Sequence, residues 1–334
     1  MKDTRKLFSL LDANIDAVLV ISTKNRMYLT GFESTAGNLI LFPNKTYFVT
    51  DTRYAEMAKQ LELEGISVFT AGVAGSVETI LDITKRLLSE NNVHTVGYED
   101  TELTVCEFNE LKEKFSDLNF VAVGDKINKV RQVKDSYEHA CIKSAQEATD
   151  KAFAKILKVI KAGMTEIELK IELEYLLFKN GGTGLAFDTI IASGINSSKP
   201  HAHPSDKRLG IGDAITMDFG ASYNGYCSDM TRTVFLGKPS EEMKKIYNIV
   251  LLAQKNVINN VAIGMTGKEV DSLAREVIIA NGYGDYFTHS TGHSLGIDIH
   301  EPPFMNTRSQ EVLEPNMYLT AEPGIYIPGF GGVR

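Results

Sequence analysis

Two aspartates on either side of an expected hairpin could hold a divalent cation. Asp218 and Asp229 lie in two β-patterned runs that flank Asn224-Gly225, and Asn-Gly between such runs is the strongest short-range hairpin signal. A two-residue type I′ turn there places Asp218 opposite Thr231. The two carboxylates become diagonal neighbours on one face, roughly 7 Å apart at Cα. Like charges at that separation repel each other, and paired carboxylates commonly bridge hard divalent ions.

The alternative interpretation is a surface hairpin with two solvated aspartates. The alternation of Ile215, Met217 and Phe219 argues against it, because those side chains point to the opposite face and into a core. A bulge near Gly220 would change the parity of the pairing and separate the carboxylates. The triplet Asp-Phe-Gly at 218–220 also occurs in protein kinases. Neither a glycine-rich loop nor a His-Arg-Asp segment accompanies it, so the kinase interpretation is rejected.

Three of the chain's 7 histidines, His289, His293 and His300, occur within residues 288–301. They are clustered among glycines, which permit close approach of the backbone to a ligand, and imidazole is a common metal ligand. The arrangement is not the His-Glu-x-x-His motif of zinc peptidases, because two prolines follow His300-Glu301 and could not lie in a helix interior. The alternative is a set of structural histidines, but their clustering favours a site.

Two further segments carry groups that could join these. Glu322 ends an apolar run that we expect to be a strand, and Pro323 keeps the backbone extended there. Taken alone, an acid in that place could equally mark a strand end. His201 and His203 lie in a proline-braced loop, residues 199–204, which taken alone is better explained as a solvated loop.

The order of the elements indicates an α/β (α+β) protein with two domains. Up to about residue 125, β-rich runs alternate with helical stretches, as in an α/β domain. A polar segment then leads to Asp135 and Glu138, which resemble a capping box at the start of a long amphipathic helix. We therefore expect domains of residues 1–128 and 129–334. The expected N-terminal strands are 17–22, 38–42, 46–50 and 66–70, and the expected helices are 51–63 and 77–90.

The second domain contains an internal repeat. The sequence Gly-Met-Thr-x-x-Glu at 163–168 recurs at 264–269, and Asn-Gly at 180–181 recurs at 281–282. Each copy begins with a capping signal, continues as an amphipathic helix and ends at an expected helix stop. Chance similarity between two helices is the alternative. A duplicated unit of helix and strands would place a site at the junction of its two halves.

Composition excludes some classes of function. A net charge of -8 and a pI near 5.5 leave no basic surface for nucleic acid or for an anionic membrane. Three widely spaced cysteines without a Cys-x-x-Cys pair suit reduced thiols better than a disulfide framework. No stretch is long enough to span a membrane, and the first residues lack a signal-peptide pattern. We expect a cytoplasmic protein.

These motifs, in this order, resemble the pita-bread metallopeptidases, the family of methionine aminopeptidase, aminopeptidase P and prolidase. In the second domain the resemblance is carried by MDFGASYNGYCSDMTRT, HSTGHSLGIDIHE and TAEPGIYIPG. In the first, MYLTGF and TDTRYAEMA resemble the creatinase-type N-terminal domain of the proline-specific branch. The resemblance covers essentially the whole chain and implies a creatinase-like α/β domain followed by a pita-bread fold with a pseudo-two-fold repeat.

The resemblance also implies a site and a reaction. The implied metal ligands are Asp218, Asp229, His293 and Glu322. The implied substrate-side histidines are His201, His289 and His300. Asp229 would bridge two divalent ions, usually Mn²⁺ or Co²⁺, which suit a set of mostly oxygen ligands. The implied reaction is hydrolysis of the peptide bond before proline, in which Glu322 assists proton transfer and His289 and His300 support the developing oxyanion. A homodimer is implied as well.

The pattern breaks at the C-terminus. The family has a fifth ligand, a glutamate two residues beyond the arginine of a Gly-Val-Arg-Ile-Glu run, whereas this chain stops at Arg334. Residues 328–332 form a turn signal with two residues left for a returning strand, which would leave a strand edge unpaired. We therefore expect a truncated sequence. Asp229, His293 and Glu322 would then hold one ion, with little activity.

Three functions remain open from the sequence. The leading one is an Xaa-Pro peptidase, either aminopeptidase P or prolidase, which act on peptides or dipeptides that contain proline. The second is a creatinase-like hydrolase of non-peptide C–N bonds, which would not need the retained Asp218, Asp229 and Glu322. The third is a catalytically impaired binding module of the same fold. The sequence does not separate dipeptidase from aminopeptidase action.

Overall fold

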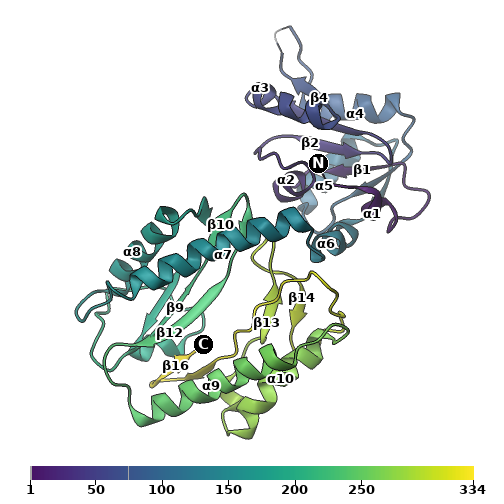
Figure 1. Ribbon diagram of the computed structural model, residues 1–334. Coiled ribbons are helices and arrows are strands. Elements are labelled where there is room, and N and C mark those ends of the chain that lie inside the picture. Colours follow the sequence, from purple (N-terminus) through teal and green to yellow (C-terminus); the bar gives the residue numbers. More distant parts are fainter. Residues whose placement is uncertain (1, 74) are drawn as a thin grey trace. The chain divides into compact units, whose positions relative to one another are not determined.

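The chain folds into two compact units, Met1–Arg131 and Gln132–Arg334, in a computed structural model that describes residues 2–73 and 75–334 (Figure 1). The boundary expected near residue 128 falls inside α6, Gly124–Gln132, because this helix continues to the junction of the two units. Among the described residues, no helix is long and apolar enough to cross a membrane.

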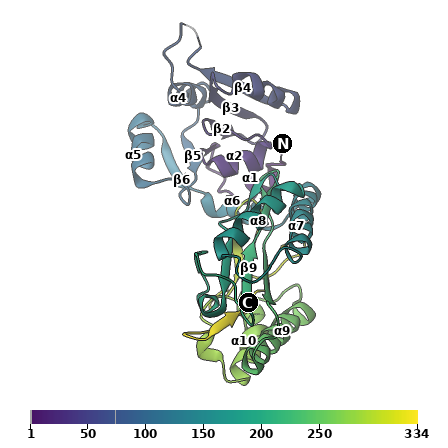
Figure 2. The ribbon, with the colours of Figure 1, turned by 90° about the vertical axis from the view of Figure 1, so that its left-hand side faces the viewer.

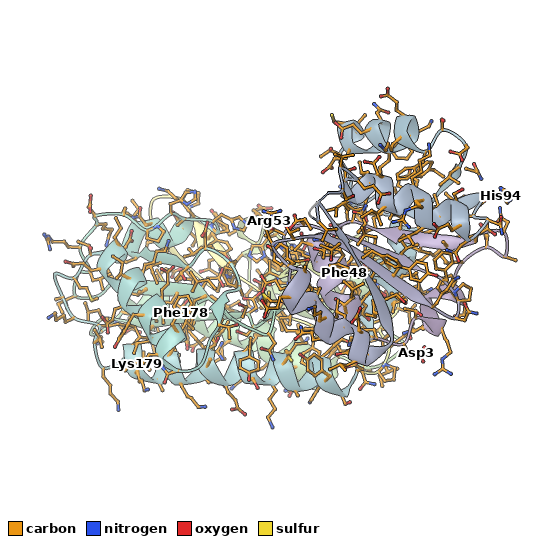
Figure 3. All side chains as sticks on the ribbon, turned by 90° about the horizontal axis from the view of Figure 1, so that it is seen from above. Asp3, Phe48, Arg53, His94, Phe178 and Lys179 are labelled. Carbon is orange, nitrogen blue, oxygen red and sulfur yellow. The ribbon has the colours of Figure 1, made fainter. Side chains whose placement is uncertain are left out.

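The first unit is built on a mixed six-stranded sheet in the order β4-β3-β2-β1-β5-β6. The strands β1, β2 and β3 pair antiparallel, while β4, β5 and β6 join in parallel fashion. Phe48, labelled in Figure 3, lies in β3 and is fully buried. The strands are β1 Ala17–Val20, β2 Asn38–Leu41, β3 Thr46–Asp51, β4 Ile66–Ala71, β5 Thr95–Tyr98 and β6 Asn119–Ala122.

Helices connect these strands, as the alternating pattern predicted, except β2 and β3, which a short turn joins. The expected helix at 51–63 is a short α-helix followed by a 3₁₀ helix, while the one at 77–90 begins at a Thr79–Asp82 capping box. The strands β5 and β6 and the helices α2 and α5 were not predicted, because their apolar patterns are short. The helices are α1 Arg5–Phe8, α2 Thr23–Thr30, α3 Ala55–Ala58, η1 Lys59–Glu64, α4 Ile80–Glu90 and α5 Val105–Lys114.

The second unit confirms the predicted repeat. Two helix pairs, α7 with α8 and α9 with α10, lie on opposite sides of the central strands (Figures 1 and 2). Both α8 and α10 have 14 residues, start at a threonine capping box and end at an asparagine. The glycine after each asparagine has a positive φ, as such a helix stop requires. The helices are α7 Ser136–Ile156, α8 Glu166–Lys179, α9 Glu241–Asn260 and α10 Gly267–Ala280.

The long helix predicted after Asp135 is present as α7, and Asp135 and Glu138 form its capping box. Its buried residues include Cys141, Ala145, Ala148 and Ile156, whereas Tyr137 is 54% exposed. On α8, buried leucines face the core, whereas Phe178 near its C-terminal end is 50% exposed (Figure 3). Each helix pair therefore presents one apolar face to the strands that carry the site residues.

Short strands form the middle of the second unit. One sheet has the order β12-β9-β8, and a second has the order β11-β10-β7. The pairs β13–β14 and β15–β16 complete the set. The strands are β7 Gly184–Leu185, β8 Ile190–Ser193, β9 Ala214–Phe219, β10 Ala221–Tyr223, β11 Tyr226–Cys227, β12 Met230–Phe235, β13 Gly292–Ser294, β14 Glu301–Met305, β15 Ile325–Ile327 and β16 Gly331–Val333. The 3₁₀ helices are η2 Gly194–Ser198 and η3 Gly284–Tyr286.

The expectation that too few residues remain after the turn for a returning strand to pair is wrong. Gly331–Val333 forms β16, which pairs antiparallel with β15. A returning strand fits in so few residues because glycines allow close packing: the N–H of Gly332 donates to Ser197 Oγ at 2.9 Å. A Cβ on Gly332 would lie 2.4 Å from the Ser197 carbonyl oxygen, so only glycine fits there.

Candidate metal centre

The hairpin that carries the two aspartates has the predicted turn and register. Tyr223 pairs with Tyr226, and Asp218 pairs with Thr231. Asn224 and Gly225 have φ of 47° and 80°, as a type I′ turn requires. The pairing keeps one register on both sides of Gly220, so the bulge considered from the sequence is absent between these described strands. A Cβ at Gly220 would lie 2.0 Å from the Ser228 carbonyl oxygen, which explains the glycine.

Three of the predicted ligands converge. One potential ligand atom from each of Asp229, His293 and Glu322 lies within 4.8 Å of the other two, a set hereafter called the ligand group. His293 Nε2 is 3.3 Å from Asp229 Oδ2 and 3.1 Å from Glu322 Oε1. His293 Nδ1 is 3.0 Å from the Ser294 carbonyl oxygen, so it donates its proton there and Nε2 faces the carboxylates.

The electrostatics of the ligand group favour a cation. Burial disfavours the charged imidazole, but hydrogen bonds to Asp229 and Glu322 prevail and raise the pKa of His293 to about 10. Burial likewise disfavours the Glu322 carboxylate, yet the His293 hydrogen bond and the positive charge of Arg334 lower the pKa of Glu322 to about 2. A cation bound between these carboxylates would take the place of the proton on Nε2.

Asp218 has a different partner. Its carboxylate forms an ion pair with the guanidinium of Arg334 and accepts a hydrogen bond from Thr231 Oγ1 at 3.0 Å. Burial, opposed by Arg334 and reinforced by the negative charges of Asp229 and Glu322, raises the pKa of Asp218 to about 6. A cation beside Asp218 was expected from the sequence, but Arg334 was not predicted to supply it.

Hydrogen bonds between two neighbouring segments hold His293 close to Glu322. The backbone N–H of His293 donates to Thr320 Oγ1 at 3.0 Å, and that hydroxyl donates to Glu322 Oε1 at 2.8 Å. A Cβ on Gly292 would lie 2.1 Å from the Thr320 carbonyl oxygen, so glycine lets the two segments approach. Thr320 was missed from the sequence; its signal is a hydroxyl two residues before the predicted ligand.

The prediction of a strand that ends at Glu322 is wrong. Residues 317–324 belong to no strand, and β15 begins only at Ile325. The N–H groups of Thr320 and Glu322 do donate to the carbonyl oxygens of His293 and Thr291, at 2.8 and 2.9 Å. Pro323 follows and has no N–H, so the ladder stops there.

Of the three predicted substrate-side histidines, His201 and His300 line a cavity and His289 does not. A cavity of about 370 Å³ is lined by the ligand group, Asp218, His201, His203, His300 and Lys170, among others. His300 packs edge-on against His293, with ring centroids 4.4 Å apart. His289 is not among the lining residues: its Nε2 is 2.8 Å from Tyr326 Oη and its Nδ1 is 2.7 Å from the Ser290 carbonyl oxygen.

Burial favours the neutral form of two of these histidines, because it lowers the pKa of both His289 and His300. Arg275 holds the His289 segment, because its guanidinium donates to the carbonyl oxygens of Phe287 and His289 at 3.0 and 2.8 Å. The neutral imidazole of His300 can donate one N–H to a ligand in the cavity, whereas both ring nitrogens of His289 already have partners elsewhere.

The ligand group fits a divalent metal ion. Two carboxylates and one imidazole, with no thiolate, suit Mn²⁺, Co²⁺ or Zn²⁺ better than a soft metal. Asp229 and Glu322 also line a second cavity, of about 860 Å³, so the group lies where two hollows of the second unit meet. Asp218 could bind a metal ion only after its ion pair with Arg334 breaks.

Comparison with known proteins agrees with this picture. Residues 140–334 match metallopeptidase family M24, and residues 7–133 match the creatinase/prolidase N-terminal domain. An uncharacterised peptidase of Bacillus subtilis, YqhT, is 42% identical over 100% of this chain and 92% of its own length. The Xaa-Pro dipeptidase of Pyrococcus furiosus is 40% identical over 98% of this chain and 92% of its own.

Solved structures give the same result. An Xaa-Pro dipeptidase from Bacillus anthracis superimposes with a TM-score of 0.93 at 41% identity, over 98% of this chain and 91% of that one. An X-Pro aminopeptidase from Thermotoga maritima superimposes with a TM-score of 0.90 at 37% identity, over 98% and 92% of the two chains. The two-domain fold predicted from the sequence, with its pita-bread second unit, is thereby confirmed.

Proposed function

Because the chain belongs to metallopeptidase family M24, we propose that it hydrolyses the peptide bond that precedes proline in dipeptides or short peptides. The observation that carries the proposal is the ligand group at the wall of a cavity lined by His201 and His300. Relatives of about 40% identity over nearly the whole chain are Xaa-Pro dipeptidases. A bond to proline is a tertiary amide without an N–H, so an enzyme must recognise it by shape and by its carbonyl.

Asp229, His293 and Glu322 would hold a divalent ion, proposed to be Mn²⁺ or Co²⁺. When bound, the ion activates water and polarises the substrate carbonyl. His293 would bind as neutral imidazole through Nε2, because Nδ1–H donates to the Ser294 carbonyl oxygen, so metal binding would require Nε2 without its proton. We propose one ion for this chain, because Arg334 already pairs with Asp218, the remaining predicted ligand.

The other polar groups would move protons and hold charge. Glu322, kept ionised by its neighbours, would accept a proton and pass it toward the proline nitrogen. His201 and His300 would donate N–H groups to the carbonyl oxygen as negative charge develops there. His289 would join them only if substrate replaced its Tyr326 hydroxyl partner.

We further propose a homodimer that works in the cytoplasm. The family resemblance motivates the dimer, and light scattering of the purified chain tests it. No disulfide joins the three cysteines, all of which the structure describes, and Cys141 and Cys227 are buried, which suits a reducing compartment.

The test of the reaction is hydrolysis of Ala-Pro and of Ala-Pro-Ala by the purified chain with added Mn²⁺. Cleavage before proline that EDTA abolishes and Mn²⁺ restores would support the proposal. Turnover of Ala-Pro alone would indicate a dipeptidase, and turnover of both an aminopeptidase. A folded chain that binds Mn²⁺ but cleaves neither peptide would overturn it.

The Arg334–Asp218 ion pair favours one second candidate, a binding module with impaired catalysis. Arg334 takes the place where a cation would meet Asp218. Such a protein would bind proline peptides in the 370 Å³ cavity without cleaving them. Calorimetric titration with Ala-Pro, in the presence of Mn²⁺ and the absence of turnover, would separate the two functions.

A further inference from the structure

A buried glutamate outside the ligand group binds two ends of one segment. Glu166, the first residue of α8, is 0% exposed. Its Oε1 accepts from the backbone N–H and the Oγ of Ser193, both at 2.7 Å. Its Oε2 accepts from the backbone N–H and the Oγ of Ser205, at 3.1 and 2.7 Å. The Asn196 side-chain amide donates to both oxygens at 3.2 Å, so one carboxylate fastens residues 193–205 at three points.

This segment carries His201. Residues 201–204 line the same cavity as the ligand group. His201 itself is exposed, so its position follows from the course of its loop rather than from burial. The hydrogen bonds of Glu166 lie on both sides of it in sequence and set that course.

The internal repeat shows that the helix junction does not need a carboxylate. The N–H groups of Glu166 and Ile167 donate to the carbonyl oxygens of Lys207 and Ser205 at 3.1 and 3.3 Å. In the second repeat, the first two N–H groups of α10 make the same bonds to residues 311 and 309, at 2.9 and 3.0 Å. Yet the residue equivalent to Glu166 is Gly267, where a Cβ would lie 2.2 Å from the Phe304 carbonyl oxygen.

Because the repeat forms this junction with glycine, the carboxylate of Glu166 has another role. We propose that Glu166 is a positioning residue that holds the 193–205 segment so that His201 faces the reacting peptide bond. The proposal rests on the proposed function only in the role given to His201.

The chemistry of the contacts requires a carboxylate rather than an amide. Both oxygens of Glu166 accept from backbone N–H groups, so a glutamine of the same shape would direct its own NH₂ at one of these donors. The negative charge is also favoured where it lies, at the N-terminus of α8. Lys207 adds a positive charge nearby, because its Nζ donates to Ser193 Oγ at 2.9 Å. Glu166→Gln should therefore release one end of the segment while it preserves the volume of the core.

The first experiment is a double-mutant cycle on Xaa-Pro hydrolysis. Glu166→Gln should lower kcat roughly 10- to 100-fold with little change in KM, since small displacements of a positioned group have effects of that size. If Glu166 acts through His201, the double variant with His201→Ala should be no slower than His201→Ala alone. Losses that multiply would show that Glu166 acts independently of His201 and would overturn the proposal.

The second experiment does not need activity. In the metal-free protein, the imidazole ¹⁵N signals of His201, assigned with His201→Gln, should shift or broaden in Glu166→Gln, while those of His94 stay in place. Glu99→Gln is the matched control: Glu99 is also 0% exposed and accepts from two backbone N–H groups and an asparagine amide, but in the first unit. That variant should leave the His201 signals unchanged.

These outcomes separate the two proposals. A folded Glu166→Gln protein with unaltered His201 signals would overturn the positioning role. A His201 signal that moves, in a chain that cleaves no proline peptide, would leave the positioning role standing and reject the peptidase.

Discussion

Two carboxylates on opposite sides of the same site respond to burial in opposite ways. The side chains of Asp218 and Glu322 are 11% and 18% exposed. The pKa of Asp218 is raised to about 6, whereas that of Glu322 is lowered to about 2. Both are close to the same guanidinium, Arg334, so the presence of a cation does not by itself explain the difference.

The difference lies in the other neighbours. Glu322 receives hydrogen bonds from the imidazole of His293 at 3.1 Å and from Thr320 Oγ1 at 2.8 Å. Asp218 receives one from Thr231 and is repelled by the charges of Asp229 and Glu322. The neighbours of Glu322 therefore keep its carboxylate ionised, and this carboxylate can accept a cation in place of the His293 proton. The Asp218 side is already neutralised by a cation of the chain.

The largest effect is expected when the imidazole is removed. His293→Ala should abolish metal retention and reduce hydrolysis by more than about 100-fold, since even outer partners of metal-binding histidines contribute roughly 10- to 100-fold to affinity. Elemental analysis after gel filtration in Mn²⁺ measures the metal, and Ala-Pro turnover measures the activity. His94→Ala is the control, because His94 lies on the first unit, outside the site (Figure 3). Retention of a full equivalent of metal by His293→Ala would show that the three residues do not form the centre.

The next effect concerns the other side of the comparison. Arg334→Ala should destabilise the metal-free chain by about 3–5 kcal/mol, because it leaves a buried carboxylate without its partner. Added Mn²⁺ should then stabilise the variant more than the wild type, since Asp218 becomes available to the ion. Thermal unfolding with EDTA and with excess Mn²⁺ measures both. Equal stabilisation of the two proteins would mean that Asp218 is no ligand even when it is free.

The pH dependence of the metal-free chain should distinguish the two sides. The folded pKa of His293, about 10, is above the ordinary 6.5, so its contribution to stability is complete below pH 6.5 and is lost as pH rises through 10. The folded pKa of Glu322, about 2, is below 4.5, so its contribution is present above pH 4.5 and is lost as pH falls through 2. Asp218, with a folded pKa of about 6 against 3.8, loses its contribution as pH rises through 6.

Unfolding midpoints in EDTA should therefore fall between pH 6.5 and pH 10 for the wild type, and His293→Gln should flatten that interval. With Mn²⁺ the trend should reverse, because metal binding requires neutral imidazole and improves as the proton becomes easier to remove. A midpoint that stays constant over this range in EDTA would mean that His293 is not protonated in the folded chain.

Local signals in the sequence were sufficient for much of this site. The Asn-Gly turn defines its own backbone geometry, so the register that sets Asp218 against Thr231 follows from two residues and the period of a strand. Capping boxes gave the starts of α7, α8 and α10 for the same reason. Each of these features depends on residues close together in the chain.

Contacts between distant residues could not be obtained in this way. Arg334 and Asp218, which form an ion pair, are 116 positions apart in the sequence. Glu166 and Ser205, which are hydrogen-bonded, are 39 positions apart. No periodicity encodes such pairs, and an arginine at the end of a glycine-rich turn has no local feature that indicates a buried ion pair. The sequence also overestimated the strand before Glu322, because an apolar run predicts burial but not a complete hydrogen-bonded ladder.

The smallest expected effect comes from two matched hydroxyl deletions. Thr320→Val removes the link between the His293 backbone and Glu322, and Thr231→Val removes the hydrogen bond to Asp218. Each should destabilise the chain by about 1.5–3 kcal/mol, the usual contribution of a hydrogen bond to a charged group. Only Thr320→Val should weaken Mn²⁺ binding, which a titration followed by calorimetry would measure.

The pair of variants tests whether the two sides are independent. If the ligand group alone holds the ion, Thr231→Val changes stability without changing the Mn²⁺ dissociation constant, because Asp218 remains paired with Arg334. Equal loss of metal affinity in both variants would instead show that Asp218 is a ligand in the metal-bound chain and that its Arg334 ion pair breaks when metal binds.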